Sequence, residues 1–351
     1  GALLQRNAAA TPDKPAYVDD DRSITWSALE AALGALEDAD VAVVPSGMAA
    51  IAAVLLPLLH PGDRALLPAD GYGPTRALAA EHLTPRGVHV DLVATQGLAH
   101  ADLSGYDLVL VETPSNPGLR VADLADVAAR AHANGRRDGA GALVVVDNTL
   151  LTPLGQRPLE LGADVVVASD TKAVNGHTDA LGGHVASRDP QVMARVRGWR
   201  TLAGGILGTH EAWLIHRGLE TLEVRFARMC ASAQAVAELA AGHPAVRAVV
   251  YPGLADHPDA EVVARQMTAA GGLVGLRFAD AAAAERFIAA AQYVVPQTSF
   301  GGTHTAAERR ARWGDDVPDG FVRLSVGVEP TAELLADLER AMTAAGGGPT
   351  A

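Results

Sequence analysis

The sequence predicts an α/β fold in which a mostly parallel, doubly wound sheet is followed by a smaller α+β domain. From Trp26 to about Gly218, short apolar runs alternate with helical stretches, as expected for parallel strands joined by crossover helices. The length of 351 residues fits two domains of ~100–200 residues each. A hydrophobic content of 49% beside a charged content of 20% is typical of a chain that buries a sizeable core.

The first predicted domain spans residues 26–218. Residues 1–25 are polar and contain prolines, so they are expected to form an N-terminal arm or linker. The apolar run Ala49–Leu59 contains Pro57 and predicts a packed helix, since a membrane span needs ~18 apolar residues or more. Short runs of β-branched or aliphatic residues predict strands at Val41–Val44, Arg64–Leu67, Ala142–Val146 and Val165–Ala168.

The second predicted domain spans residues 219–345. It is expected to begin with a helix over Leu219–Ala241 and to close with a helix over Thr331–Ala345. Residues 346–351 are expected to form a flexible tail. The strands predicted between the two helices lie near Val246–Tyr251, Gly272–Phe278 and Phe321–Val326.

Charge and cysteine content narrow the class of protein. The net charge of −13 argues against a nucleic-acid partner, because a binder of phosphate backbones needs a basic face. Neither a membrane span nor a signal peptide is predicted. Cys230 is the only cysteine, so no internal disulfide can form, and a cytoplasmic location is predicted. The spacing of His210 and His216 differs from that of an H-E-x-x-H zinc site, and no metal is predicted.

The segment Ser169-Asp170-Thr171-Lys172 is the most informative about function. It follows the predicted buried strand Val165–Ala168, where an uncompensated ammonium would be costly. A Schiff base between Lys172 and pyridoxal phosphate (PLP) would suit this position, with the hydroxyls of Ser169 and Thr171 on the phosphate. From this segment alone, a strand-end lysine that points at solvent fits equally well.

Asp147 favours the cofactor. It ends another predicted strand, 25 residues before Lys172 (172 − 147), which leaves room for a crossover and one more strand. Both residues are then expected at the carboxyl ends of strands, where open α/β sheets bind ligands. A carboxylate there would keep the ring nitrogen of PLP protonated, as its action as an electron sink requires. A lone aspartate in this position is otherwise a helix cap or a turn residue.

Two further segments have both a structural and a functional interpretation. Pro45-Ser46-Gly47-Met48 precedes a predicted helix, whose first N–H groups could bind an anion, although a serine N-cap explains the pattern too. Asp70-Gly71-Tyr72-Gly73 follows a predicted strand, and its glycines leave Tyr72 free to lie flat on a ring. The latter segment is not a dinucleotide fingerprint, because the third glycine of that motif is missing.

Taken in order, seven motifs resemble those of the Cys/Met-metabolism PLP enzymes. This family holds the cystathionine γ-lyases, cystathionine β-lyases, γ-synthases and methionine γ-lyases. The resemblance runs from about Trp26 to Arg340 and implies the PLP-dependent transferase fold of type I, with residues 26–218 as the PLP-binding domain. The motifs are SGMAA (46–50), DGYGPTR (70–76), VETPSNP (111–117), VVVDNT (144–149), SDTKAVNGHTDALGG (169–183), TSFGG (298–302) and RLSVGVE (323–329).

The resemblance also implies roles for individual residues. Lys172 would be the Schiff-base lysine and would take the Cα proton, while Tyr72 would stack on the ring and could protonate the leaving thiolate. Arg323, helped by Ser299, would hold the substrate α-carboxylate, which suits the bidentate geometry of a guanidinium. The implied cofactor-binding residues are Gly47, Met48, Tyr72, Asn116, Asp147, Ser169, Thr171 and Lys172. Among them, Asp147 would pair with the pyridine nitrogen and Asn116 would lie near the phenolic oxygen.

The chain departs from the family pattern near its start. Family members carry a Tyr-x-Arg pair that reaches the phosphate of a neighbouring subunit. Alignment of residues 23–25 with the Asn-Pro-Thr that follows this pair places Val18 and Asp20 at its positions. Tyr17 and Arg22 could replace the pair only in a shifted register.

Two more departures lie near the predicted site. Ala173 replaces the tyrosine that usually follows the lysine. The segment between Ser299 and Arg323 is short, and it contains the basic run Glu308-Arg309-Arg310-Ala311-Arg312-Trp313, which resembles that of shorter bacterial relatives. This run could form a patch for a phosphate or a partner, or a solvated helix.

The resemblance implies a PLP-dependent carbon–sulfur lyase. It would cleave L-cysteine, cystathionine or a cysteine S-conjugate by elimination, to release a thiol with pyruvate and ammonia. Cystathionine γ-lyase or γ-synthase chemistry uses the same residues and stays open, as does a catalytically silent scaffolding domain. A homodimer or homotetramer is expected, because the family builds each site at a subunit interface.

The ends of the chain suggest one further alternative. The chain lacks an initiator Met and most of the family's amino-terminal arm, which fits either engineering or a domain cut from a larger protein. One such relative is the cysteine-lyase (SH) domain of leinamycin-type polyketide synthases, whose substrate is a carrier-bound cysteine adduct.

Overall fold

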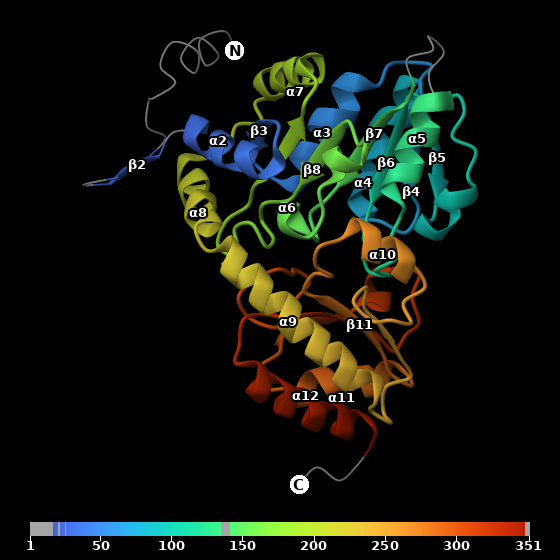
Figure 1. The fold of residues 1–351 in the computed structure, drawn as a ribbon, viewed down its shortest axis with the longest axis vertical. Coiled ribbons are helices and arrows are strands. Elements are labelled where there is room, and N and C mark those ends of the chain that lie inside the picture. The colour runs from blue at the N-terminus through green and yellow to red at the C-terminus, as the bar shows by residue number, and fades with distance from the viewer. Residues whose placement is uncertain (1–16, 20–21, 25, 135–140, 348–351) are drawn as a thin grey trace.

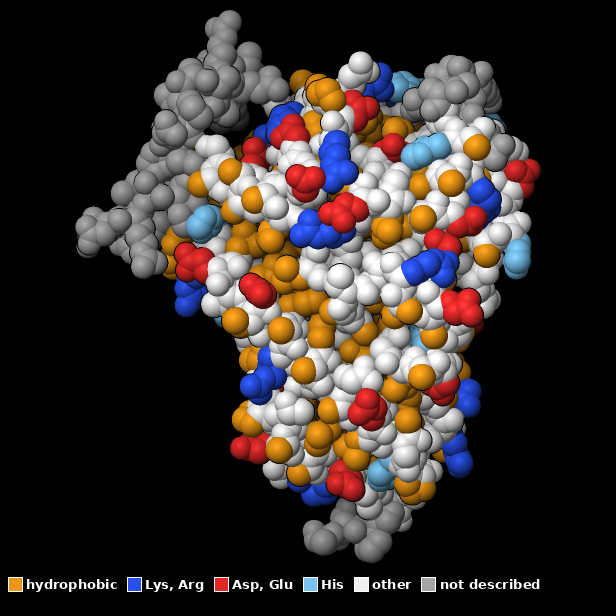
Figure 2. All heavy atoms as spheres, viewed as in Figure 1, with side chains coloured by type: hydrophobic (Ala, Val, Ile, Leu, Met, Phe, Trp, Pro, Cys, Tyr) orange, Lys and Arg blue, Asp and Glu red, His pale blue; other side chains and the backbone are white. Residues whose placement is uncertain are grey.

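The computed structural model of the chain describes residues 17–19, 22–24, 26–134 and 141–347. A large part is built on a seven-stranded sheet, and a smaller C-terminal part on a five-stranded sheet (Figure 1). Helix α9 (Leu222–Ala241) leads from the first part along the second. None of the helices in the described residues is long and apolar enough to cross a membrane. On the face drawn in Figure 2, basic and acidic side chains are interspersed.

The large sheet has the strand order β3-β9-β8-β7-β6-β4-β5. Strand β9 is antiparallel to both of its neighbours, and all the other pairs in this sheet are parallel. The predicted mostly parallel α/β sheet is therefore confirmed. The strands are β3 (Asp40–Val44), β4 (Arg64–Pro68), β5 (His89–Val93), β6 (Leu108–Glu112), β7 (Leu143–Asp147), β8 (Val165–Ala168) and β9 (Gly183–Ser187).

Helices cover both faces of this sheet, so it is doubly wound. Because successive side chains of a strand point to opposite faces, β7 contributes to two separate cores. Val144 and Val146 pack on the side of α2 (Trp26–Glu37), α5 (Leu124–Asn134) and α8 (Thr209–Leu219). Val145 packs on the side of α3 (Gly47–Leu58) and α7 (Pro190–Ala203).

Short elements connect these strands and helices. They are α4 (Gly73–Leu78), η1 (Ala79–Leu83), η2 (Thr84–Arg86), η3 (Thr95–His100), α6 (Thr152–Gly155) and η4 (Pro158–Leu161). Near the start of the chain, β1 (Tyr17–Asp19) and β2 (Arg22–Ile24) form a separate antiparallel pair. This pair lies beside α8, at the edge of the molecule (Figure 1).

The smaller part packs α9, α11 and α12 against a sheet of order β10-β11-β14-β13-β12. Helix α10 instead contacts the large part, where Asp259 at its N-terminus accepts two 2.7 Å hydrogen bonds from Arg120. The elements are β10 (Ala248–Val250), α10 (Ala260–Gln266), β11 (Leu273–Arg277), α11 (Ala281–Ala290), β12 (Val295–Pro296), β13 (Ala306–Arg309), η5 (Arg310–Trp313), β14 (Phe321–Ser325) and α12 (Thr331–Ala345).

The predicted helix Leu219–Ala241 is wrong at its start. Leu219 ends α8, and α9 begins at Leu222. The break is stabilised by Arg225, whose guanidinium donates to the carbonyls of Gly218, Ala173 and Val174. Of these three carbonyls, that of Gly218 lies in the last turn of α8, where a continuous helix would have bonded it internally.

Other boundaries agree more closely. Helix α12 and strand β8 have the predicted bounds, and the other predicted strands differ by at most two residues at either end from β3, β4, β7, β10, β11 and β14. The patterns above do not single out β5, β6, β9, β12 and β13. Gly346 and Gly347 follow α12 in a turn, and residues 348–351 lie outside the described residues. The limits of the two domains stay a prediction.

Candidate active site

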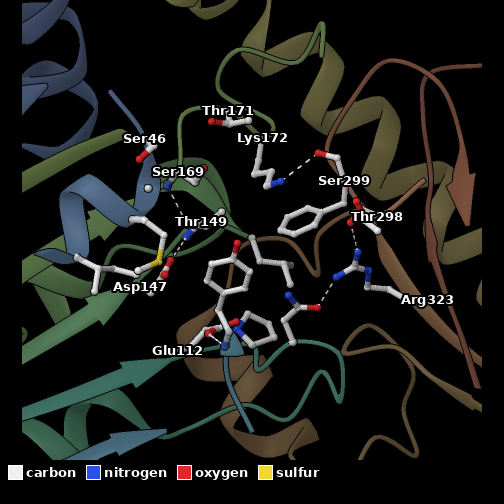
Figure 3. Close-up of a pocket in the computed structure, with 18 of the residues that line it drawn as sticks. Ser46, Glu112, Asp147, Thr149, Ser169, Thr171, Lys172, Thr298, Ser299 and Arg323 are labelled. Carbon is white, nitrogen blue, oxygen red and sulfur yellow. Dashed lines mark hydrogen bonds between the residues drawn. The ribbon is translucent and has the colours of Figure 1, made fainter. Parts of the chain in front are cut away.

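A cavity of about 320 Å³ lies between the two parts of the molecule, and residues of both parts line it (Figure 3). All ten residues predicted from the sequence to form the site line this one cavity: Gly47, Met48, Tyr72, Asn116, Asp147, Ser169, Thr171, Lys172, Ser299 and Arg323. Residues up to 276 positions apart (323 − 47) are thus brought together.

Lys172 points into the cavity. The alternative that the sequence left open, a strand-end lysine that points at bulk solvent, is therefore excluded. Its Nζ atom donates a 3.0 Å hydrogen bond to Ser299 Oγ and lies 4.8 Å from the centre of the Phe300 ring. Burial, and after it the charge of Arg323, lowers the pKa of Lys172 to about 8. Near neutral pH the ammonium form therefore still predominates, but the neutral, nucleophilic form is far more populated than in an ordinary lysine. The chain has one other lysine, Lys14, which lies outside the described residues.

Asp147 and Glu112 are direct neighbours at the ends of β7 and β6. Both line the cavity and are otherwise enclosed by protein. Burial raises the pKa of Asp147, although the hydroxyl and N–H of Thr149 oppose this. Burial, and next the charge of Asp147, raises the pKa of Glu112 well above its usual range. Among the described residues, no Lys, Arg or His forms an ion pair with Asp147. A cationic ring nitrogen beside Asp147 would supply the missing countercharge, which fits a protonated pyridine.

The start of helix α3 forms a cradle for an anion. Ser46 caps the helix by accepting a 3.1 Å hydrogen bond from the Ala49 N–H. A Cβ atom on Gly47 would lie 2.6 Å from the Ser169 Cβ, so only glycine allows this close approach. The helix N-terminus and the segment after β8 therefore meet at one point, as a bound phosphate requires. The Thr171 hydroxyl lines the same end, but it also bonds both backbone groups of Gly182.

Tyr72 is positioned by a residue that the sequence analysis did not single out. Its backbone N–H donates a 2.6 Å hydrogen bond to Glu112 Oε2. A Cβ atom on Gly71 would lie 2.6 Å from that same oxygen, so the glycine lets the carboxylate reach the Tyr72 backbone. Arg76 holds the loop from the other side through a 2.6 Å hydrogen bond to the Gly71 carbonyl. The Tyr72 side chain lines the cavity and is 45% exposed.

Arg323 comes from the other part of the molecule, in the middle of β14. Its guanidinium donates to Asn116 Oδ1 at 2.7 Å and to the Thr298 carbonyl, and lies 5.2 Å from the Phe300 ring centre. Burial, and next the charge of Arg310, lowers the pKa of Arg323 to about 10. The side-chain oxygen of Asn116 is thus engaged with Arg323.

A buried charged group supports the segment that carries Lys172. His184 on β9 lies between Asp170, 2.7 Å from Nδ1, and Glu37, 3.2 Å from Nε2. All three side chains are at most 2% exposed. Burial lowers the pKa of His184, but the two carboxylates outweigh this and raise it to about 10. In the described residues, no group of three or more His, Cys, Asp or Glu side chains could hold a metal ion.

Of the ten other residues that line the cavity, four with an aromatic, charged or hydroxyl side chain used in the description of the site were not predicted: Glu112, Thr149, Phe300 and Arg310. Three of them lie inside the recognised motifs, and Glu112 and Thr149 adjoin strand ends. The strand-end argument that selected Asp147 could therefore have found these two. Arg310 lies in the basic run, where nothing in the local pattern distinguishes it from its neighbours.

Comparison with known proteins identifies the family. The family model described as "Cys/Met metabolism PLP-dependent enzyme" matches residues 19–343. This chain belongs to that family. Its cofactor is PLP, its fold is the PLP-dependent fold of type I, and it is an enzyme of the carbon–sulfur lyase type, as predicted.

Relatives of several activities match almost the whole chain. A putative cystathionine gamma-lyase of Streptomyces coelicolor is 47% identical, and the match covers 94% of this chain and 84% of the relative's length. An L-methionine gamma-lyase of Pseudomonas deceptionensis is 40% identical, and the match covers 91% of this chain and 83% of the relative's length. In the crystal structure of a cystathionine gamma synthase from Xanthomonas oryzae, 35% identical, the match covers 92% of this chain and 86% of that one, with a TM-score of 0.85.

The departures from the family pattern have different outcomes. Ala173 is buried, and its backbone carbonyl accepts a 2.7 Å hydrogen bond from Arg225. In the β1–β2 pair, Asp19 lies opposite Arg22 and Tyr17 opposite Ile24. In Figure 1 this pair lies at the edge of the molecule, and none of its described residues lines the cavity. The inter-subunit phosphate clamp stays a prediction.

Proposed function

We propose that this enzyme cleaves the carbon–sulfur bond of an S-substituted L-cysteine or of cystathionine by β-elimination. Water completes the reaction, and the products are a thiol, pyruvate and ammonia. The observation that carries the proposal is the amine of Lys172, whose pKa is lowered to about 8, enclosed in one cavity with Arg323 and Asp147. A group with a pKa this close to neutrality can both accept and return a proton near neutral pH.

The residues of the cavity fit PLP and divide into two sets. Gly47, Met48, Ser169 and Thr171 would hold the phosphate, Asp147 the ring nitrogen, and Lys172 the aldehyde group. When bound, PLP would supply an electron sink for the charge that develops at the substrate Cα. The buried carboxylate of Asp147 keeps that sink effective, because it favours the protonated ring nitrogen.

The remaining residues would act on the substrate. Arg323 would bind its α-carboxylate, and Ser299, which accepts a hydrogen bond from Lys172 Nζ, would keep this amine beside Cα. Lys172 would then remove the Cα proton. The Tyr72 hydroxyl would protonate the departing sulfur, and Glu112 would fix its loop through the Tyr72 N–H. The cytoplasmic location and the carrier-bound substrate stay predictions.

A second candidate is γ-elimination or γ-replacement. It is favoured by the relatives themselves, since the two described above are named for γ-lyase activities and the crystal structure for a γ-synthase. The γ route needs a further proton removal at Cβ, and Lys172 could perform it. By contrast, the family match and the convergence of all ten predicted residues argue against a silent scaffold.

The product distinguishes the two routes. The PLP-loaded enzyme is incubated with L-cysteine, an S-alkyl-L-cysteine and cystathionine, and the 2-oxo acid is identified by mass spectrometry. Pyruvate with every substrate supports β-elimination. A predominance of 2-oxobutyrate from cystathionine would replace it by γ-elimination, and no 2-oxo acid from any substrate would contradict both elimination routes.

We also propose that the partner of this chain is a second copy. Tyr72 and Leu181 line the cavity and yet are 45% and 62% exposed. Leu202 in the last turn of α7 and Ile206 just after that helix are 87% and 40% exposed. Large apolar side chains at the edge of an active site favour a covering protein surface. Sedimentation of the PLP-loaded enzyme should give a dimer or tetramer, and a fully active monomer would contradict this.

A further inference from the structure

The basic run at residues 308–313 has no role in the reaction described above. In the structure it spans the end of β13 and the 3₁₀ turn η5. Arg309 lies opposite Val322 in the sheet, so η5 starts beside the strand that carries Arg323. Of the three arginines in the run, only Arg310 lines the cavity.

The turn is fixed on both sides of Arg310. On one side, Glu308 is 1% exposed and accepts hydrogen bonds from Arg312 Nε and Nη2 and from Trp313 Nε1. On the other side, Asp315 accepts a 2.6 Å hydrogen bond from Arg310 Nε. A side chain held in this way is preorganised, so less conformational entropy is lost when it binds a ligand.

The donors of Arg310 are mostly unused. Its guanidinium carries five N–H groups, and within the described part of the chain only Nε has a hydrogen-bond partner. The Nη atoms are left to the cavity, although the side chain is only 15% exposed. By contrast, both Nη atoms of Arg323 already have partners, Asn116 and the Thr298 carbonyl. Unfilled donors on a largely enclosed cation favour an anionic acceptor.

The charges of the cavity are separated into two ends. The carboxyl groups of Glu112 and Asp147 lie at the end where the cofactor ring would bind, and the guanidinium groups of Arg310 and Arg323 come from the C-terminal part. Arg310 is close enough for its charge to act on Arg323. One guanidinium is sufficient for the α-carboxylate, so the second is available for another anionic group of the substrate.

We infer that Arg310 is a specificity residue that binds a carboxylate at the distal end of the substrate, beyond the sulfur atom. This rests on the proposed function and narrows its substrate class. The preferred substrates are then S-substituted cysteines whose substituent ends in a carboxylate, cystathionine among them. Substrates with a neutral substituent of the same size are turned over less efficiently.

Three matched substrates test this inference: S-(2-carboxyethyl)-, S-(2-carbamoylethyl)- and S-(2-aminoethyl)-L-cysteine, which are anionic, neutral and cationic. The measured quantity is the ratio of kcat/KM between the anionic and the neutral substrate. For the unaltered enzyme this ratio is expected to exceed one, and in Arg310→Gln it should fall about 10- to 150-fold, the value of one hydrogen bond to a charged group. The change should arise in KM rather than in kcat.

Two further variants keep the test decisive if Arg310→Gln is poorly folded. Arg310→Lys should retain part of the preference, and Arg310→Glu should shift it toward the cationic substrate. The control is Arg309→Gln, since Arg309 pairs with Glu285 outside the cavity; its ratio should equal that of the unaltered enzyme. Bound cofactor, measured by its visible absorbance, checks that each variant is folded.

The possible failures are distinguishable. If the unaltered enzyme shows no preference for the anionic substrate, or if Arg310→Gln lowers kcat/KM equally for all three, the inference is wrong while the proposed function stands. If the unaltered enzyme releases pyruvate from none of the substrates, the proposed function fails, and the inference fails with it.

Discussion

The two ends of the cavity are built in different ways. At the cofactor end, Asp147 and Ser169 follow neighbouring parallel strands, and Thr149 joins them: its N–H donates to Asp147 and its hydroxyl accepts from the Ser169 N–H. At the substrate end, Arg323 reaches across from the other part of the molecule to Asn116, 207 residues away in sequence. The cofactor end is therefore a property of one sheet edge, whereas the substrate end depends on how two parts pack together.

This difference makes an experimental distinction possible. Changes at the cofactor end should affect PLP binding and every reaction, and changes at the substrate end should affect KM and specificity while PLP stays bound. Lys172 lies between the two ends, in contact with Ser299 and near Phe300. Lys172 is therefore the one position where a substitution should affect PLP binding and the handling of the substrate together.

Lys172→Ala is accordingly expected to have the largest effect. Turnover should be abolished while the fold survives, because the amine makes one side-chain hydrogen bond and its removal leaves the core intact. Borohydride reduction of the PLP-loaded enzyme, followed by peptide mass spectrometry, should find the label on Lys172. Lys14→Arg is the control, since Lys14 is the chain's only other lysine. More than a small residual activity in Lys172→Ala would contradict the assignment.

The same contrast explains how far the sequence predicts the site. Asp147 and Ser169 follow β-branched runs, and parallel strand ends meet at one edge, so the local pattern is sufficient to place them together. Arg323 and Ser299 have no such pattern and were found only through the family resemblance. The position of Arg310 depends on the hydrogen bonds from Arg312 and Trp313 to Glu308 and from Arg310 to Asp315. These bonds join residues only four or five positions apart, but they form in an irregular turn, so no helix or strand period reveals that Arg310 faces the cavity.

The fold shows the same limit. Val165–Ala168 and Thr331–Ala345 have the predicted bounds, because each has a clear period and no competing long-range contact. The break between α8 and α9 was missed because it depends on Arg225, whose guanidinium reaches carbonyls about 50 residues away (225 − 173 = 52). Prediction from pattern therefore succeeds within elements and fails where a tertiary contact overrides them.

Arg323→Ala should give the next largest effect, and this effect should be confined to the substrate end. Loss of a buried charge-assisted contact to the α-carboxylate costs ~2–5 kcal/mol, which corresponds to a KM about 30- to 5,000-fold higher. PLP should remain bound, because the cofactor end is untouched. KM and the cofactor absorbance are both measured, with Arg277→Ala, exposed on the neighbouring strand β11, as the control. Loss of PLP with an unchanged KM would show that the two ends are not separate.

The buried His184 predicts a pH dependence of stability at the cofactor end. Its pKa is raised from 6.5 to about 10 in the folded protein. The stability that its charge contributes is therefore fully present below about pH 6.5 and is lost as the pH rises toward 10. Each unit of raised pKa corresponds to ~1.4 kcal/mol, so the loss is on the order of a few kcal/mol.

Urea unfolding of the apo-protein between pH 6.5 and 10 measures this loss. The unaltered chain should become steadily less stable over this range, and His184→Gln should be less stable at pH 6.5 with a flatter pH profile. His100→Gln, at an exposed position, should follow the unaltered chain. An unchanged slope in His184→Gln would mean that this group is not charged in the folded state.

The smallest effect is expected from the β1–β2 pair, and it tests whether the cofactor end is complete within one chain. Tyr17 and Arg22 stand where a shifted form of the family's phosphate clamp could arise, but Gly47, Ser169 and Lys172 already converge on one site. One charge-assisted contact is worth ~1.5–3 kcal/mol, so its absence would loosen PLP without emptying the cavity. Tyr17→Phe and Arg22→Ala should therefore change PLP affinity little, as measured by titration of the apo-protein. A drop of about 100-fold or more, near the ~3 kcal/mol upper end for one such contact, would show that the clamp persists in the shifted register. The cofactor end would then depend on a second subunit, as the substrate end depends on the second part of the chain.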